Sequence, residues 1–112
     1  MFKTKPTDSF KFKVQLHAPG VGRVTCGFEG RHLDGDALQE AMAGSDNDAE
    51  FVQAVVTGWN RKDFDADFSD AELAAMLKAY PGLGTQIARA YLAELSGAPQ
   101  VKNSPMPAVT GL

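Results

Sequence analysis

The chain has 112 residues, 44% of them hydrophobic and 22% charged, with a net charge of −3. This length suits one domain that buries its own core, and the acidic balance argues against general binding to nucleic acid. The single cysteine excludes an internal disulfide and is compatible with a reducing compartment. No apolar run is long enough to cross a membrane, and the N-terminus lacks the apolar core of a signal peptide. We therefore expect a cytoplasmic protein.

The first third of the chain has the alternation of a β-hairpin. Residues 18–22 combine a proline with two glycines, which is the composition of a turn. Two strands alone are marginally stable in water, so we expect their apolar face to pack on a helix or a third strand. That face consists of alternate residues of the two predicted strands: Phe10, Phe12, Val14 and Leu16 in the first, and Val24, Cys26 and Phe28 in the second.

Two short helices are predicted after the hairpin. The first has apolar residues at helical spacing from Leu33 and ends at Gly44. Either Asp46 or Asn47 caps the second, which runs toward Gly58 and the tryptophan that follows it. Three consecutive β-branched residues at positions 55–57 also favour a strand at its end.

The next segment places three aspartates at alternate positions, as the first half of a calcium-binding loop does. Such a loop also needs a glycine at its sixth position and a glutamate at its twelfth, but this chain has Phe68 and Ala74 there. Ser69 stands three residues before Glu72 and ahead of an apolar helical series, which is the pattern of a capping box. We therefore predict a third helix that is capped by Ser69 and ends near Tyr80. The three acids are then expected to be exposed residues of a linker: Asp63, Asp65 and Asp67.

A fourth helix is predicted after Pro81 and Gly82, with Tyr91 on its apolar face and Gly97 at its end. Residues 98–112 contain three prolines among small polar residues, and we expect a disordered tail. The predicted fold class is α+β, with a single domain in residues 1–97 and a flexible C-terminal tail in residues 98–112. In the domain, an N-terminal antiparallel β-hairpin packs on a small bundle of about four helices.

No arrangement of residues predicts catalysis, a metal or a cofactor. His17, Cys26 and His32 are metal-binding residue types, but their spacing matches no standard zinc site and a fourth ligand is missing. The serines lack the G-x-S-x-G context of a nucleophile elbow. Two short glycine pairs, at 20–22 and 82–84, lie in the wrong context for a dinucleotide-binding turn. We expect a protein that is not an enzyme.

Residues 58–98 carry a resemblance to a known family in the order of their features. The order is Gly58-Trp59, an acidic spacer, Phe68-Ser69, a Leu73–Leu77 helix, Tyr80-Pro81-Gly82, and Tyr91-Leu92 before Gly97. This region resembles the C-terminal half of phage tail assembly chaperones, small proteins encoded among the tail genes of tailed bacteriophages and prophages. The front half of the chain is similar in layout only.

The resemblance implies a non-catalytic protein that binds the tape measure protein, keeps it soluble and delivers it to the major tail tube protein. It also implies a location in the cytoplasm of the bacterial host and absence from the mature virion. The alternative is a small nucleic-acid-binding or regulatory module that uses the basic hairpin from Lys3 to Arg31, through salt-dependent phosphate contacts.

A protein partner that offers an amphipathic helix would dock in a groove through regularly spaced apolar anchors. Five aromatic residues are candidates for lining it: Phe64, Trp59, Phe68, Tyr80 and Tyr91. For Trp59, Phe68 and Tyr91 we favour a place in the core, where aromatic residues are common. Phe64 stands alone between two acids, so we expect it to be exposed.

Overall fold

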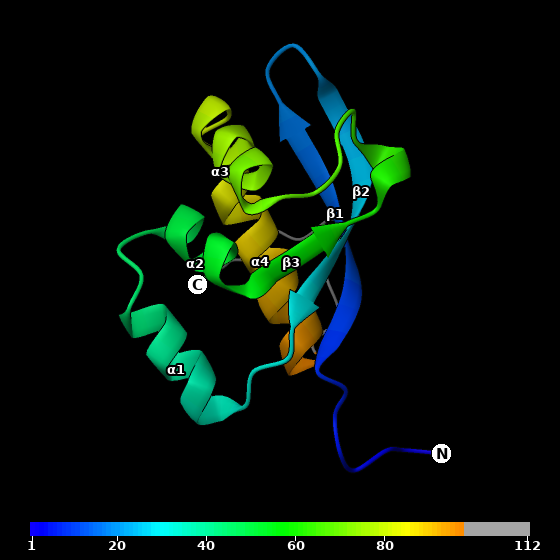
Figure 1. The fold of residues 1–112 in the computed structure, drawn as a ribbon, viewed down its shortest axis with the longest axis vertical. Helices are drawn as coiled ribbons and strands as arrows, with labels where there is room; N and C mark the ends of the chain where they lie inside the picture. Colours follow the sequence, from blue (N-terminus) through cyan, green and yellow to red (C-terminus); the bar gives the residue numbers. More distant parts are fainter. Residues whose placement is uncertain (98–112) are drawn as a thin grey trace, which may run out of the picture.

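The computed structural model describes residues 1–97 as a three-stranded antiparallel sheet with helices packed on one face (Figure 1). The tail predicted for residues 98–112 lies outside the described residues. No helix in the described part is long and apolar enough to span a membrane. The architecture confirms the predicted α+β class. In chain order the elements are β1 Ser9–Ala18, β2 Gly22–Arg31, α1 Gly35–Ala43, α2 Asp48–Val55, β3 Val56–Trp59, the 3-10 helix η1 Arg61–Asp63, α3 Asp70–Ala79 and α4 Leu83–Ser96.

The hairpin forms as its alternation predicts. β1 pairs with β2 along its whole length, from Ser9 opposite Arg31 to Ala18 opposite Gly22. Every second side chain of β1 from Phe12 onward is buried against the helices, and the residues between them are exposed. At the tip, Gly22 and the glycine two residues before it have positive φ, a conformation that glycine adopts without strain.

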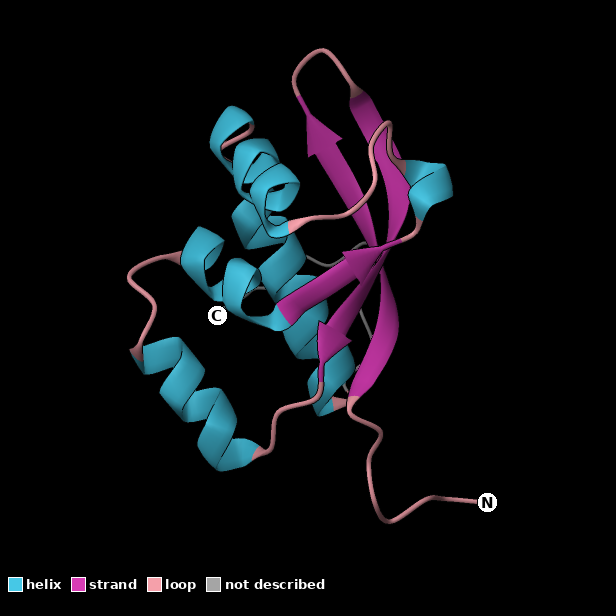
Figure 2. Ribbon diagram, in the orientation of Figure 1, coloured by secondary structure: helices cyan, strands magenta, loops and turns pink. Residues whose placement is uncertain are grey.

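β3 was not predicted as a strand of its own. The second helix was expected to run toward Trp59, but α2 ends at Val55 and the chain then pairs with β2 (Figure 2). The β-branched residues Val56 and Thr57 fit a strand better than a helix, because their stiff side chains pack well on a pleated surface. The pairing places Trp59 opposite Phe28 of the hairpin.

Side-chain caps begin the first three helices. The side-chain oxygens of Asp34, Asn47 and Ser69 each accept a hydrogen bond from the N–H three residues further on, at 2.9, 2.9 and 3.0 Å. The structure therefore selects Asn47 over Asp46 and confirms Ser69 as a cap. In a complete capping box, the Ser69 N–H would also donate a hydrogen bond to the Glu72 side chain. This second bond is absent among the described residues, so only the serine half of the capping box is present.

Tyr91 of α4 joins the helices to the sheet. Its side chain is fully buried, and its ring packs on Phe10, Phe12 and Phe51 with centroid distances of 5.5, 5.8 and 5.7 Å. Its hydroxyl donates a hydrogen bond of 2.6 Å to the carbonyl oxygen of Arg31 at the end of β2. The predicted core position of Tyr91 is confirmed, and its one side-chain polar group has a partner, as a buried hydroxyl requires.

α4 also protects the outer edge of β1. The amide of Gln86 accepts a hydrogen bond from the His17 N–H at 2.8 Å and donates one to the His17 carbonyl oxygen at 3.0 Å. At an edge strand, the backbone N–H and carbonyl of His17 have no neighbouring strand to pair with, and the Gln86 amide binds both of them instead. Further along α4, Gly84 allows close contact with α2, because a Cβ there would lie 3.1 Å from the backbone nitrogen of Ala49. Together these contacts fix α4 between β1 and α2.

We predict that Gly30→Ala destabilises the fold. A Cβ at this buried glycine of β2 would lie 2.9 Å from two ring carbons of Tyr91 and 3.2 Å from Phe12. Overpacking of this kind costs about 1–3 kcal/mol in the free energy of unfolding, measured by urea denaturation. The control is Gly35→Ala at the start of α1, where nothing lies within 4 Å of an added Cβ. Equal stability of the two variants would contradict this account of the core.

Candidate protein-binding site

The linker between β3 and α3 folds back onto the sheet. The Gly27 N–H of β2 donates a hydrogen bond of 2.8 Å to the carboxylate of Asp63. Arg61 forms an ion pair of 2.8 Å with Asp67. The expectation of exposed linker acids therefore holds for Asp65 and Asp67 and is wrong for Asp63, which is half-buried because it caps a backbone group of the sheet.

Phe64 is not exposed and alone, as we expected, but half-buried within an aromatic cluster. Its ring stacks on Trp59 with a centroid distance of 4.1 Å and meets Phe28 edge-on at 5.5 Å. The indole of Trp59 contacts Phe68 at 5.2 Å and donates a hydrogen bond of 3.0 Å to the carbonyl oxygen of Ala66. The prediction was wrong because the apolar neighbours of Phe64 come from other elements, where local periodicity does not reveal them.

Next to this cluster, a groove of ≈ 410 Å³ opens between the tip of the hairpin and α3. The buried side chain of Leu83, at the start of α4, contributes to its lining. Its walls come from three parts of the chain that are distant in sequence. The apolar side chains along them include Val21 and Val24 from the hairpin, Trp59 and Phe64 from β3 and the linker, and Met76 and Tyr80 from α3 and its end.

The groove collects three of the five aromatic residues predicted for a binding surface: Trp59, Phe64 and Tyr80. Phe68 packs on Trp59 but does not line the groove, and Tyr91 belongs to the core. We favoured a core position for Trp59 and Phe68, and both are half-buried and packed against the margin of the core. Contact of any of these residues with a partner stays a prediction.

The hairpin also lines the groove, and two of its apolar residues there are exposed, which we did not predict. Val21 is 55% exposed and Val24 is 40% exposed. Val24 was assigned to the buried face of its strand, and it does line the groove with Cys26, but it is only partly covered there. The signal for Val21 was present in the sequence, because a valine between two glycines is unusual in a turn, where polar residues dominate.

Carboxylates line the groove without compensating cations. Asp63, Asp65 and Glu72 are part of its lining, and no lysine or arginine of residues 1–97 is. Asp63 is engaged by a backbone N–H, whereas Asp65 and Glu72 are exposed. The groove therefore combines an apolar surface with a negative rim.

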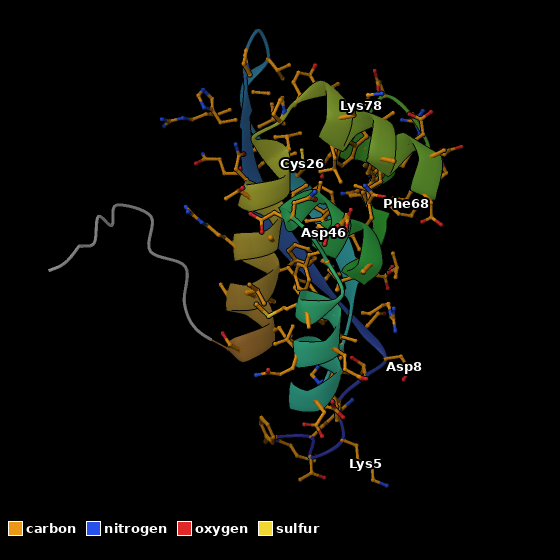
Figure 3. All side chains as sticks on the ribbon, turned by 90° about the vertical axis from the view of Figure 1, so that its left-hand side faces the viewer. Lys5, Asp8, Cys26, Asp46, Phe68 and Lys78 are labelled. Atoms are coloured by element: carbon orange, nitrogen blue, oxygen red, sulfur yellow. The ribbon has the colours of Figure 1, made fainter. Side chains whose placement is uncertain are left out.

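Cys26 contributes a buried wall of the groove, and Figure 3 labels it between the sheet and the helices. Its side chain is 3% exposed. Burial raises the pKa of the thiol, and the nearby carboxylate of Asp63 raises it further. Because the thiolate is the nucleophilic form, this cysteine is an apolar packing group and not a reactive one.

Two lysines of the hairpin lie on the other face of the sheet. Lys11 and Lys13 are exposed residues of β1 and, with Arg61, line a second and larger depression of ≈ 760 Å³. Glu29 and Glu94 line it as well, so its charge is mixed. A binding surface for a nucleic-acid backbone is expected to be consistently basic, so this face gives the alternative function little support.

Comparison with known protein families identifies the family of this chain. A family model described as phage tail assembly chaperone matches residues 1–103. The chain belongs to the phage tail assembly chaperone family. The match spans the hairpin as well as the helices, so it extends well beyond residues 58–98 and confirms the family that they indicated. The search of curated proteins and the search of solved structures each returned no match.

The aromatic cluster predicts that Phe64→Ala destabilises this chaperone. Removing a half-buried ring that contacts Trp59 and Phe28 should cost about 1–3 kcal/mol, less than truncating a fully buried phenylalanine. Phe2, which is 88% exposed, supplies the control, and Phe2→Ala should change the stability by less than about 0.5 kcal/mol. Urea denaturation measures both. A Phe64→Ala variant as stable as Phe2→Ala would show that the stacking contributes little.

The burial of Cys26 predicts slow reaction with a thiol reagent such as DTNB. The unfolded chain ionises its thiol at a lower pH than the folded chain does, so folding should slow the reaction at least about tenfold at pH 8. The same chain in urea is the control. Equal rates in the folded and unfolded chains would contradict the burial.

The raised pKa of Cys26 also affects the free energy of unfolding. As the pH rises past the ordinary pKa of cysteine, the thiol of the unfolded chain loses its proton first, so the stability of the fold falls.

Proposed function

We propose that this chaperone binds the tape measure protein during tail assembly and delivers it to the major tail tube protein. Family membership over residues 1–103 carries this proposal. The same membership favours a non-catalytic role. The protein then acts in the cytoplasm of the bacterial host and is absent from the finished virion.

The groove supports a role in binding another protein. A soluble domain of this size gains stability by covering its apolar side chains, yet Val21 and Val24 remain exposed beside Trp59, Phe64 and Met76. Contiguous exposed apolar surface with a polar rim is typical of a surface that a partner covers. The walls of the groove are held by paired strands and a capped helix. Association therefore requires little ordering of the chaperone itself.

Co-expression tests the proposal. The tape measure protein from the same tail gene cluster is expressed with the tagged full-length chaperone, and in parallel with an unrelated acidic protein of similar size. We expect the tape measure protein to be soluble and to copurify with the chaperone only. A second co-expression with the major tail tube protein tests delivery. If the tape measure protein stays insoluble and no tail protein copurifies, the proposed function is wrong.

A further inference from the structure

We propose that the groove between the hairpin tip and α3 is the docking site for an amphipathic helix of the partner, with lysine or arginine along the margins of its apolar face. This inference rests on the proposed function, because it assigns the partner's binding site on the chaperone. It names contacts that the aromatic pattern of the sequence did not indicate, in particular Val21 and Val24.

The apolar part of the groove is lined mainly by residues with apolar side chains. The hairpin contributes the face of its strands, α3 contributes its side, and the linker contributes aromatic rings. Pairing of a new strand with β2 beyond β3 is blocked at Gly27, whose N–H is bound by Asp63 and whose carbonyl oxygen is bound by the Asn60 N–H at 2.9 Å. A partner that binds through side chains alone is best served by the apolar face of a helix, as in helix-in-groove recognition.

The charges of the groove define the flanks of this helix. Asp65 and Glu72 are exposed carboxylates, and the groove has no lysine or arginine in its lining within residues 1–97. A partner with acidic flanks would bring like charges together without compensation, whereas lysine or arginine flanks pair with the rim. The chemistry therefore selects a cationic amphipathic helix over an anionic one.

The exposed valines give the first test, by copurification of the tape measure protein with variants of the full-length chaperone. Val21→Asp and Val24→Asp place a charge in the apolar surface and should reduce the retained partner about tenfold or more. The matched control is Met42→Asp in α1, because Met42 is 51% exposed and lies outside the groove. Thermal melts accompany each variant. Val21 lies in the turn, where its backbone N–H donates to the Ala18 carbonyl oxygen, so Val21→Asp carries the test if Val24→Asp does not fold.

Charge reversal gives the second test. The double variant Asp65→Lys, Glu72→Lys should bind the partner less at low salt, and the difference should shrink as salt screens the rim. The control is Asp36→Lys, Glu40→Lys in α1, which reverses two exposed charges away from the groove. Equal loss in both double variants would point to net charge alone and would overturn the proposed role of the rim.

A direct readout comes from Trp59, the only tryptophan of the chain. The probe is a synthetic peptide without tryptophan or tyrosine, with leucines at helical spacing flanked by lysines. Its binding should change the emission of Trp59 in the wild type and much less in Val21→Asp. A peptide of the same composition with alternating leucines, and a helical peptide with glutamate flanks, should bind about tenfold more weakly or worse. Preference for either of these peptides would overturn the proposal.

The outcomes separate this inference from the proposed function. If the wild type retains the tape measure protein and Val21→Asp and Val24→Asp retain it equally well, the function stands and the groove is not the site. If the wild type retains no tail protein, the function itself fails. A dimer in sedimentation that Val21→Asp dissociates would assign the groove to a second copy of the chain and overturn the proposed partner.

Discussion

The contact between Tyr91 and the end of β2 is the constraint on which the rest of this structure depends. The ring lies so close to Gly30 that no side chain fits there, and the hydroxyl binds the next carbonyl oxygen along the strand. One residue therefore fixes α4 against both strands of the hairpin and against Phe51 of α2. A hairpin is marginal by itself, and this contact gives it a rigid support.

The same helix connects this anchor to the groove. Leu83 at the start of α4 contributes to the lining of the groove, and Tyr91 lies about 12 Å further along the helix axis, at a rise of about 1.5 Å per residue. Between them, Gln86 holds the edge of β1. The core is thus complete around Tyr91 and remains open at the hairpin tip. Val21 and Val24 are exposed at this open end, where Leu83 is the first residue of α4.

The sequence predicted the elements whose causes are local. Alternating side chains located the hairpin, and the capping residues Asn47 and Ser69 located two helix starts, since each cap acts within one turn. The exposed position expected for Phe64 was wrong because its burial depends on contacts that are distant in the sequence. Its ring contacts Phe28, which is distant in the sequence, and the linker lies against β2, where Asn60 and Asp63 both bind Gly27. The groove also depends on three distant segments, so a single periodic stretch gives no sign of it.

The acidic rim has a consequence for the chaperone as well as for its partner. Two copies that met groove to groove would bring Asp65 and Glu72 of one against those of the other, and the repulsion would oppose self-association through the apolar surface. Such repulsion would allow the domain to keep Val21 and Val24 exposed. Toward a cationic helix the same charges are attractive, and they act mainly on the rate of encounter. In the proposed complex, the valines and the aromatic rings would exclude water only after docking, so they would govern how long the complex lasts.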